Sequence, residues 1–285
     1  MILVADSGSS KTDWLLQVPD NSPLGFKTKG INPFYFSEKE IIKILNASED
    51  IVKHAPRVSE VHFFGAGCSS PDRREIVSNA LSAVFKTAFV NVEDNVIGCV
   101  YATCGKSRGM VGILGTGSNS AYFDGSKVHY SKHGLGFILG DEGSATHFGK
   151  SLITSYLYGE MPKDLKKDFG DMYKLTKEIV INHVYQKTTP NWYLASFLDF
   201  MLKKRSHPYI QSLLFEGVEE FFNQAVLIFP AAPYVPCHFV GAVAYHFQDT
   251  LKEICSKHGI TPGKTLEHPI REIYDFVVER ATESV

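Results

Sequence analysis

The stretch ILVADSGSSKTDWLL at residues 2–16 decides the fold, and the stretch MVGILGTGSNSAYF at residues 110–123 repeats its design. Each consists of an apolar run, a short turn of glycine and hydroxyl residues, and a second run with apolar character. This pattern predicts two β-strands joined by a tight loop. Glycine lets a loop backbone approach a ligand, while consecutive turn amides and Ser or Thr hydroxyls form an anion-binding concavity. Two such loops in one chain predict a clamp on a polyphosphate.

The rest of the first half alternates between strand and helix signals. Ser37 and Ser70 precede amphipathic runs and are predicted helix starts. The apolar run at 61–64 predicts a buried strand and the run at 89–92 predicts another short strand. Asp94 lies where this second strand passes into a helix. The predicted fold class is therefore α/β.

The small polar segment 104–109 comes directly before the second loop, and we place a domain boundary there. The predicted domains are residues 1–107 and residues 108–285. The second domain repeats the opening hairpin and is predicted to become mostly helical from about residue 144 to residue 224, as an insertion. Whether the last helix packs back on the first domain stays open.

The composition is that of an ordinary globular protein. Of 285 residues, 44% are hydrophobic and 21% are charged, with 29 basic side chains against 31 acidic ones. There is no long basic tract, and the apolar stretch 221–247 is interrupted by prolines, so neither nucleic acid nor a membrane is an expected partner. The chain opens with a buried strand instead of a charged leader, which predicts a cytoplasmic location. The scattered cysteines favour reduced thiols over disulfides, a zinc site or an iron–sulfur cluster.

Taken alone, the first loop is a common kind of hairpin turn. Further features follow it along the chain in an order that points to a functional site. They are Asn32, Asp94, the loop Gly115-Thr116-Gly117-Ser118, the segment Gly140-Asp141-Glu142-Gly143-Ser144, and the turn Gly241-Ala242.

This ordered set resembles the acetate and sugar kinase, Hsp70 and actin superfamily. Within it, the set is similar to the N-acetylglucosamine kinase and BadF/BadG-type ATPase group. The resemblance spans Asp6 to about Glu253, and the pair Gly-Thr-Gly-Ser and Gly-Asp-Glu-Gly-Ser-Ala is its most specific part. It implies two ribonuclease-H-like domains of the actin and hexokinase type that flank a cleft. It also implies ATP-dependent phosphorylation of a hexosamine.

The resemblance also implies a role for particular residues. Asp6 resembles the residue that holds Mg²⁺ through water, and Asp94 resembles the catalytic base. The implied ATP contacts are Gly8, Ser9, Ser10, Lys11, Thr12, Thr116, Gly117, Ser118, Gly241 and Ala242. The implied sugar contacts are Asn32, Phe34, Asp94, Gly134, Asp141 and Ala145. Ser7 and Ser9 stand where relatives usually have glycine, which is expected to alter the first loop.

The role of Asp94 has two interpretations. A carboxylate with a reference pKa of about 3.9 beside a helix N-terminus should stay ionised at neutral pH and can accept a proton from a sugar hydroxyl. The alternative is that Asp94 only caps its helix. Asp141 and Glu142 are adjacent, so as strand neighbours they would point in opposite directions. We expect Asp141 to bind sugar hydroxyls and Glu142 to support the loop.

The leading hypothesis is a Mg²⁺- and ATP-dependent kinase that phosphorylates a hydroxyl of an aminosugar, N-acetylglucosamine or a close analogue. One alternative is a BadF-type ATPase that activates a dehydratase. Another is a sugar sensor that binds without turnover. The sequence does not fix the oligomeric state, and a homodimer stays open.

Overall fold

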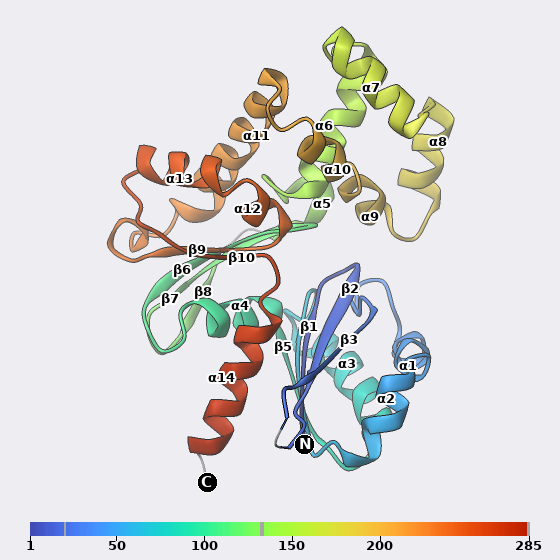
Figure 1. Ribbon diagram of the computed structural model, residues 1–285, viewed down its shortest axis with the longest axis vertical. Helices are drawn as coiled ribbons and strands as arrows, with labels where there is room; N and C mark the ends of the chain where they lie inside the picture. Colours follow the sequence, from blue (N-terminus) through green and yellow to red (C-terminus); the bar gives the residue numbers. More distant parts are fainter. Residues whose placement is uncertain (20, 132–133, 284–285) are drawn as a thin grey trace. The chain divides into compact units, whose positions relative to one another are not determined.

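The computed structural model describes residues 1–19, 21–131 and 134–283 (Figure 1). The chain divides into two compact units, one made of Met1–Lys106 with His268–Val285 and the other of Ser107–Glu267. Each unit contains a five-stranded sheet with helices, which confirms the predicted α/β class.

The sheet of the first unit has the strand order β3-β2-β1-β4-β5. Its central strand, β1, pairs antiparallel with β2 and parallel with β4, and β4 pairs parallel with β5. The strands are β1 (Ile2–Ser7), β2 (Lys11–Leu16), β3 (Leu24–Lys29), β4 (Glu60–Gly65) and β5 (Phe89–Asp94). The carboxyl ends of β1, β4 and β5 therefore meet at one edge, and that edge carries Asp6 and Asp94.

The sheet of the second unit has the same topology, in the order β8-β7-β6-β9-β10. The hairpin of β6 and β7 corresponds to that of β1 and β2, and β9 pairs parallel with β6 as β4 does with β1. The strands are β6 (Gly109–Leu114), β7 (Ser118–Phe123), β8 (Val128–Tyr130), β9 (Cys237–Val240) and β10 (Pro262–Leu266). The two repeated stretches thus form equivalent hairpins of a duplicated fold, as predicted.

Helices cover both faces of the first sheet. Adjacent strand residues point to opposite faces. Accordingly Phe63 packs in a core with Leu81, while Phe64 contacts Gly98. The helices are α1 (Glu38–Asn46), α2 (Glu49–His54), η1 (Ala55–Arg57), α3 (Pro71–Val84), α4 (Asn95–Thr103) and α14 (Ile270–Glu283). Thus α1 and α3 lie on one face, and α14 lies beside α4 on the other (Figure 1).

Both predicted helix starts in this unit are confirmed. The Ser37 N–H donates to Glu40 Oε2 at 2.8 Å at the start of α1. Ser70 precedes Pro71, the first residue of α3.

The second unit carries the predicted helical region. Its helical segments are α5 (Gly136–Leu139), α6 (Ala145–Tyr158), α7 (Lys163–Tyr173), α8 (Lys177–Ile181), η2 (Asn182–Gln186), α9 (Pro190–Ala195), α10 (Leu198–Lys203), α11 (Pro208–Phe221), η3 (Phe222–Val226), η4 (Ala232–Tyr234), α12 (Ala242–His246) and α13 (Gln248–Lys257). An aromatic core fixes several of them, with the rings of Phe169 and Phe200 4.9 Å apart. Across the described ranges, no helix combines the length and apolar character required to span a bilayer.

Helices α6 and α9 meet through Gly149, where a Cβ would overlap the Leu194 carbonyl oxygen. We expect Gly149→Ala to lower the free energy of unfolding by about 1–3 kcal/mol, because overpacking forces the two helices apart. Gly170→Ala on α7 is the matched control. A Cβ there meets the Tyr156 hydroxyl at 2.9 Å, at the end of a side chain that can move. Urea denaturation of both variants checks this, and equal stabilities would contradict it.

Candidate active site

The first loop, Gly8-Ser9-Ser10, joins β1 to β2 in a tight turn. The Gly8 N–H donates to the Lys11 carbonyl oxygen at 3.0 Å and closes the turn. The N–H groups of Ser9 and Ser10 have no hydrogen-bond partner within the described residues. Gly30 supports the loop from behind, since a Cβ there would lie 2.5 Å from the Ser9 carbonyl oxygen. The loop therefore offers free backbone donors on a fixed support.

Two of the hydroxyls in this region hold the strands together. Ser7 is fully buried, and its Oγ lies 2.7 Å from Thr12 Oγ1. The same oxygen accepts the Ile31 N–H at 3.0 Å. Ser7, which stands where relatives usually have glycine, thus links the hairpin to the segment that carries Asn32. Thr12 is also fully buried, so an ATP contact from its side chain stays a prediction.

Asn32 lies against the first loop. Its Nδ2 donates to Ser9 Oγ at 3.0 Å, and its Oδ1 accepts the Phe34 N–H at 2.9 Å. Gly67, at φ +84°, leaves the space that the Asn32 amide fills. Phe34 is 58% exposed, and the Arg73 guanidinium carbon lies 3.5 Å from its ring centre. The structure therefore brings together two implied sugar contacts and the implied phosphate loop.

Asp6 lies at the end of β1 in a row of charged side chains. It is paired with Asp13 of β2, which is paired in turn with Lys27 of β3. Asp13 forms ion pairs with Lys11 at 3.2 Å and Lys27 at 3.3 Å. The Asp6 carboxylate, by contrast, has no hydrogen bond to any described residue.

The surroundings of Asp6 disfavour its negative charge. Burial, and to a smaller extent the Asp13 carboxylate, raise the pKa of Asp6 to about 7, while Lys11 opposes the rise. Mg²⁺ prefers oxygen ligands and keeps several of its waters. An unpaired carboxylate beside a second one therefore fits a hydrated Mg²⁺. Asp13 was not identified from the sequence, because only the strand register places it beside Asp6.

Asp94 ends β5 and caps α4. Its Oδ1 accepts the Val96 N–H at 2.9 Å, which confirms the capping interaction. The sequence predicted that the helix N-terminus would keep this carboxylate ionised. Asp94 is only 5% exposed, and this burial raises its pKa, although the Val96 N–H and Arg74 both oppose the rise. Desolvation, which the prediction from sequence did not include, outweighs the helix terminus.

The second loop joins β6 to β7 and is fastened to the start of α6. The Gly115 N–H donates to the Gly117 carbonyl oxygen at 3.0 Å. The carbonyl oxygens of Gly115 and Thr116 accept the N–H groups of Ala145 and Thr146 at 2.9 and 3.2 Å. Among the residues described, the N–H groups of Thr116 and Gly117 have no hydrogen-bond partner. Ala145 is 3% exposed and supports the loop, so its sugar contact stays a prediction.

Gly241 brings the predicted adenosine motif to the base of this loop. At φ +116°, a Cβ on Gly241 would lie 2.5 Å from the Leu114 carbonyl oxygen. Only glycine fits this close approach without strain. Ala242 follows as the first residue of α12.

Asp141 reaches over the second loop from a strained turn. Its φ is +62°, in the left-handed region, so Asp141 and Glu142 are not strand neighbours as the sequence predicted. Asp141 Oδ1 accepts the Ser118 N–H at 3.2 Å, and a Cβ on Gly117 would lie 2.8 Å from Asp141 Oδ2. Asp141 itself thus supports the loop, a role predicted for Glu142.

Burial also raises the pKa of Asp141, to about 6, while the Ser118 N–H and Lys150 oppose the rise. Lys150 was not identified from the sequence. Its Nζ donates to the Phe137 carbonyl oxygen at 2.6 Å and so holds the segment that begins at Gly134. An i, i+4 or i, i+3 pattern could not have indicated this contact, because it joins two different helices.

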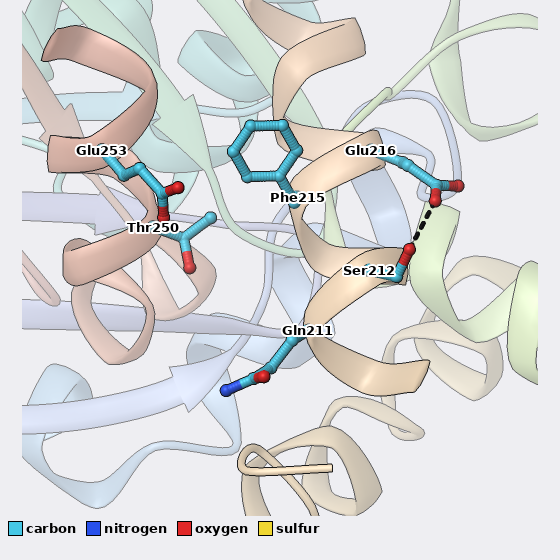
Figure 2. A pocket seen from close by; sticks show the side chains of 6 residues that line it. All are labelled: Gln211, Ser212, Phe215, Glu216, Thr250 and Glu253. Atoms are coloured by element: carbon cyan, nitrogen blue, oxygen red, sulfur yellow. Dashed lines mark hydrogen bonds between the residues drawn. The ribbon is translucent and has the colours of Figure 1, made fainter. Parts of the chain in front are cut away.

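A separate groove on the second unit contains none of the predicted site residues. It encloses about 420 Å³ and is lined by residues of α11 and α13 (Figure 2). The lining residues are Gln211, Ser212, Phe215, Glu216, Thr250 and Glu253. The Ser212 hydroxyl donates to Glu216 Oε1 at 2.6 Å (Figure 2), so both side chains already have a hydrogen-bond partner within the groove.

The duplicated sheets and their amide-bearing loops define the two-domain fold of the sugar kinase, Hsp70 and actin superfamily. Neither a protein-family model nor a curated protein sequence matches the chain. A solved structure from Porphyromonas gingivalis, provisionally assigned as an N-acetylglucosamine kinase, is 37% identical with a TM-score of 0.92. The match covers 99% of this chain and 100% of the other. The chain therefore belongs to the same family of sugar kinases as this protein.

More distant structures share the fold. A Chromobacterium violaceum protein, also provisionally assigned as an N-acetylglucosamine kinase, is 16% identical with a TM-score of 0.68, over 97% of this chain and 98% of the other. A glucokinase of the ROK family from Streptomyces griseus, solved with glucose and AMPPNP, is 12% identical with a TM-score of 0.55, over 96% and 98% of the two chains.

The raised pKa of Asp6 predicts how pH affects stability. Because this pKa is about 7 in the folded chain and about 4 when unfolded, the Asp6 contribution to the free energy of unfolding falls as pH rises between these values. We expect Asp6→Asn to melt at a higher temperature than the parent protein near pH ~8 and at the same temperature near pH ~4. Added Mg²⁺ is expected to raise the melting temperature of the parent at the higher pH, and not that of the variant.

Asp171→Asn is the control, since it makes the same change at an exposed site on α7. Differential scanning calorimetry across the pH range measures the effect. If Asp6→Asn and the parent melted at the same temperature at every pH, the charged Asp6 carboxylate would not destabilise the folded chain, and the prediction would be wrong.

Proposed function

We propose that the protein is an ATP- and Mg²⁺-dependent kinase that transfers the γ-phosphoryl group to a hydroxyl of an aminosugar, N-acetylglucosamine or a close analogue. The main observation in support is that both repeated loops present unpaired backbone N–H groups beside a residue implied to contact sugar. These residues are Asn32 at the first loop and Asp141 at the second.

The chemistry of phosphoryl transfer needs these features. The reaction depends on positioning and on neutralising charge around the phosphates, and it needs little covalent help. The free N–H groups of Ser9, Ser10, Thr116 and Gly117 serve as donors to phosphate oxygens. Mg²⁺, when bound near Asp6, supplies positive charge to the phosphates. Lys11, held by its ion pair with Asp13, adds a fixed cation at the edge of the first loop.

Asp94 serves as the base that receives the proton of the acceptor hydroxyl. Its Oδ1 is occupied by the Val96 N–H, while Oδ2 makes no hydrogen bond to a described residue. A general base works best when its pKa is near the working pH, so the rise caused by burial favours this role. The carboxylate is held in place by its cap and has one oxygen to offer the sugar.

The choice of an aminosugar rests on family membership and on the surroundings of Asn32. The P. gingivalis relative is provisionally assigned as an N-acetylglucosamine kinase. Phe34 presents an exposed ring, backed by Arg73, next to the buried Asn32 amide. An aromatic face beside an amide suits a sugar that carries a flat, partly apolar acetamido group.

An assay of ADP release with a panel of sugars tests the proposal. The panel contains glucosamine, N-acetylglucosamine, N-acetylmannosamine, N-acetylmuramic acid and glucose. We expect release to depend on both Mg²⁺ and an acetylated aminosugar. Glucose as the sole good acceptor would defeat the aminosugar assignment. ATP hydrolysis without any sugar would instead favour the ATPase alternative, and sugar binding without turnover would favour a sensor.

Two substitutions separate the base and cap roles of Asp94. Asparagine is also a good N-cap, so Asp94→Asn keeps the bond to Val96, whereas Asp94→Ala loses both roles. We expect Asp94→Asn to keep the melting temperature and sugar affinity of the parent while kcat falls by about 10²–10⁴. Asp94→Ala is expected also to lose about 1 kcal/mol of stability. A kcat for Asp94→Asn within about threefold of the parent would remove Asp94 as the base.

A further inference from the structure

We propose that Ser9 couples sugar binding to nucleotide binding through its hydrogen bond with Asn32. This inference rests on the proposed kinase function and adds a positioning residue to it. Both residues belong to the first unit, and the bond from Asn32 Nδ2 to Ser9 Oγ is 3.0 Å long. The bond joins the implied sugar contact directly to the implied phosphate loop.

The Asn32 side chain is held so firmly that a ligand would meet it in one orientation. It is 5% exposed, its Oδ1 accepts the Phe34 N–H, and Gly67 packs so close to that oxygen that a Cβ at residue 67 would overlap it. An asparagine amide has two N–H donors and two acceptor sites. The contacts with Ser9 and Phe34 use one of each. One donor and one acceptor site remain for a sugar hydroxyl or acetamido group.

The Ser9 hydroxyl can pass the effect of that ligand to the loop. Because Oγ accepts from Asn32, its own proton is free to be donated, and it lies in the turn whose Ser9 and Ser10 N–H groups are unpaired. Hydrogen bonds in a chain polarise one another and strengthen by about 10–30% per bond. A sugar hydroxyl that donates to Asn32 Oδ1 therefore strengthens the Nδ2 donation to Ser9 and makes Ser9 a better donor to a phosphate oxygen. It also fixes the side-chain rotamer that the nucleotide needs.

The two neighbouring serines do not share this link. Ser7 Oγ is fully buried among Thr12 and Ile31. Ser10 is exposed, and within the described residues its hydroxyl bonds to no other group. The loop thus contains one hydroxyl that touches Asn32 and one that does not, which provides an internal comparison.

Calorimetric titration with AMPPNP and Mg²⁺, with and without saturating N-acetylglucosamine, measures the coupling. We expect the sugar to raise AMPPNP affinity in the parent protein by at least about fivefold, within the usual range for coupled sites. In Ser9→Ala and Ser9→Gly this ratio is expected to fall to nearly one, and sugar-free AMPPNP affinity is expected to fall as well because a hydroxyl donor to phosphate is lost. Ser9→Thr restores the ratio because it restores the hydroxyl.

Ser10→Ala is the matched control. It removes a hydroxyl from the same turn, so it lowers AMPPNP affinity equally with and without sugar and leaves the ratio unchanged. By linkage, AMPPNP must change sugar affinity by the same factor as the sugar changes AMPPNP affinity. The reverse titration therefore repeats the measurement independently.

The outcomes separate this inference from the function on which it rests. A parental ratio of one, or a parental ratio retained in Ser9→Ala and Ser9→Gly, overturns the coupling while sugar-dependent ADP release still stands. A ratio lost equally in Ser9→Ala and Ser10→Ala also overturns it, because the link to Asn32 would not matter. If no sugar of the panel binds and none stimulates ADP release, the proposed kinase function itself fails.

Discussion

A hydrogen bond between a hairpin turn and one side chain from a distant segment sets the geometry of each cluster of predicted site residues. In the first unit Asn32 donates to Ser9, and in the second Asp141 accepts from Ser118. The hairpin alone would leave its tip free to move, because short loops are ordered mainly by contacts outside them. Each bond fixes the turn and also brings a polar side chain beside unpaired N–H groups. These bonds add to the contacts that Gly30 makes with the first loop and that the Ala145 and Thr146 N–H groups make with the second.

The buried carboxylates of these sites lower the stability of the folded chain when they are charged. Burial is the largest cause of the raised pKa of Asp6, Asp94 and Asp141, and each is opposed by nearby donors or cations. A carboxylate removed from water without full compensation disfavours the folded state. Such groups at strand ends and turns, two in the first unit and one in the second, are typical of sites where ligands, and not the protein, complete the electrostatics. The fold therefore tolerates local strain that a purely structural role would not require.

The sequence predicted the elements whose signals are local and missed the residues placed by tertiary structure. The twin hairpins, the helix starts at Ser37 and Ser70, and the capping by Asp94 all follow from patterns within a few residues. Asp13, Gly67 and Lys150 gave no such signal, because cross-strand register or a contact with a segment distant in sequence brings each to its place.

One wrong prediction and one omission have the same origin. Asp141 and Glu142 were expected to be strand neighbours, but the flanking Gly140 and Gly143 favour a turn and Asp141 itself is left-handed. The prediction for Asp94 considered its helix terminus and omitted the burial that raises its pKa, which only the folded chain reveals. Local sequence patterns report donors and caps, whereas the degree of desolvation depends on everything that packs around the group.

The two loops are equivalent in topology but not in charge. The first has a neutral partner, since the Asn32 amide adds no charge near its free N–H groups. The second has a carboxylate as its partner, and Asp141 Oδ2 approaches the space beside Gly117. A phosphate on the second loop would meet this negative charge and raise the Asp141 pKa further above its present value of about 6. Asp141 thus disfavours a highly charged phosphate at the second loop, whereas at the first loop Lys11 offsets part of the negative charge of Asp6 and Asp13.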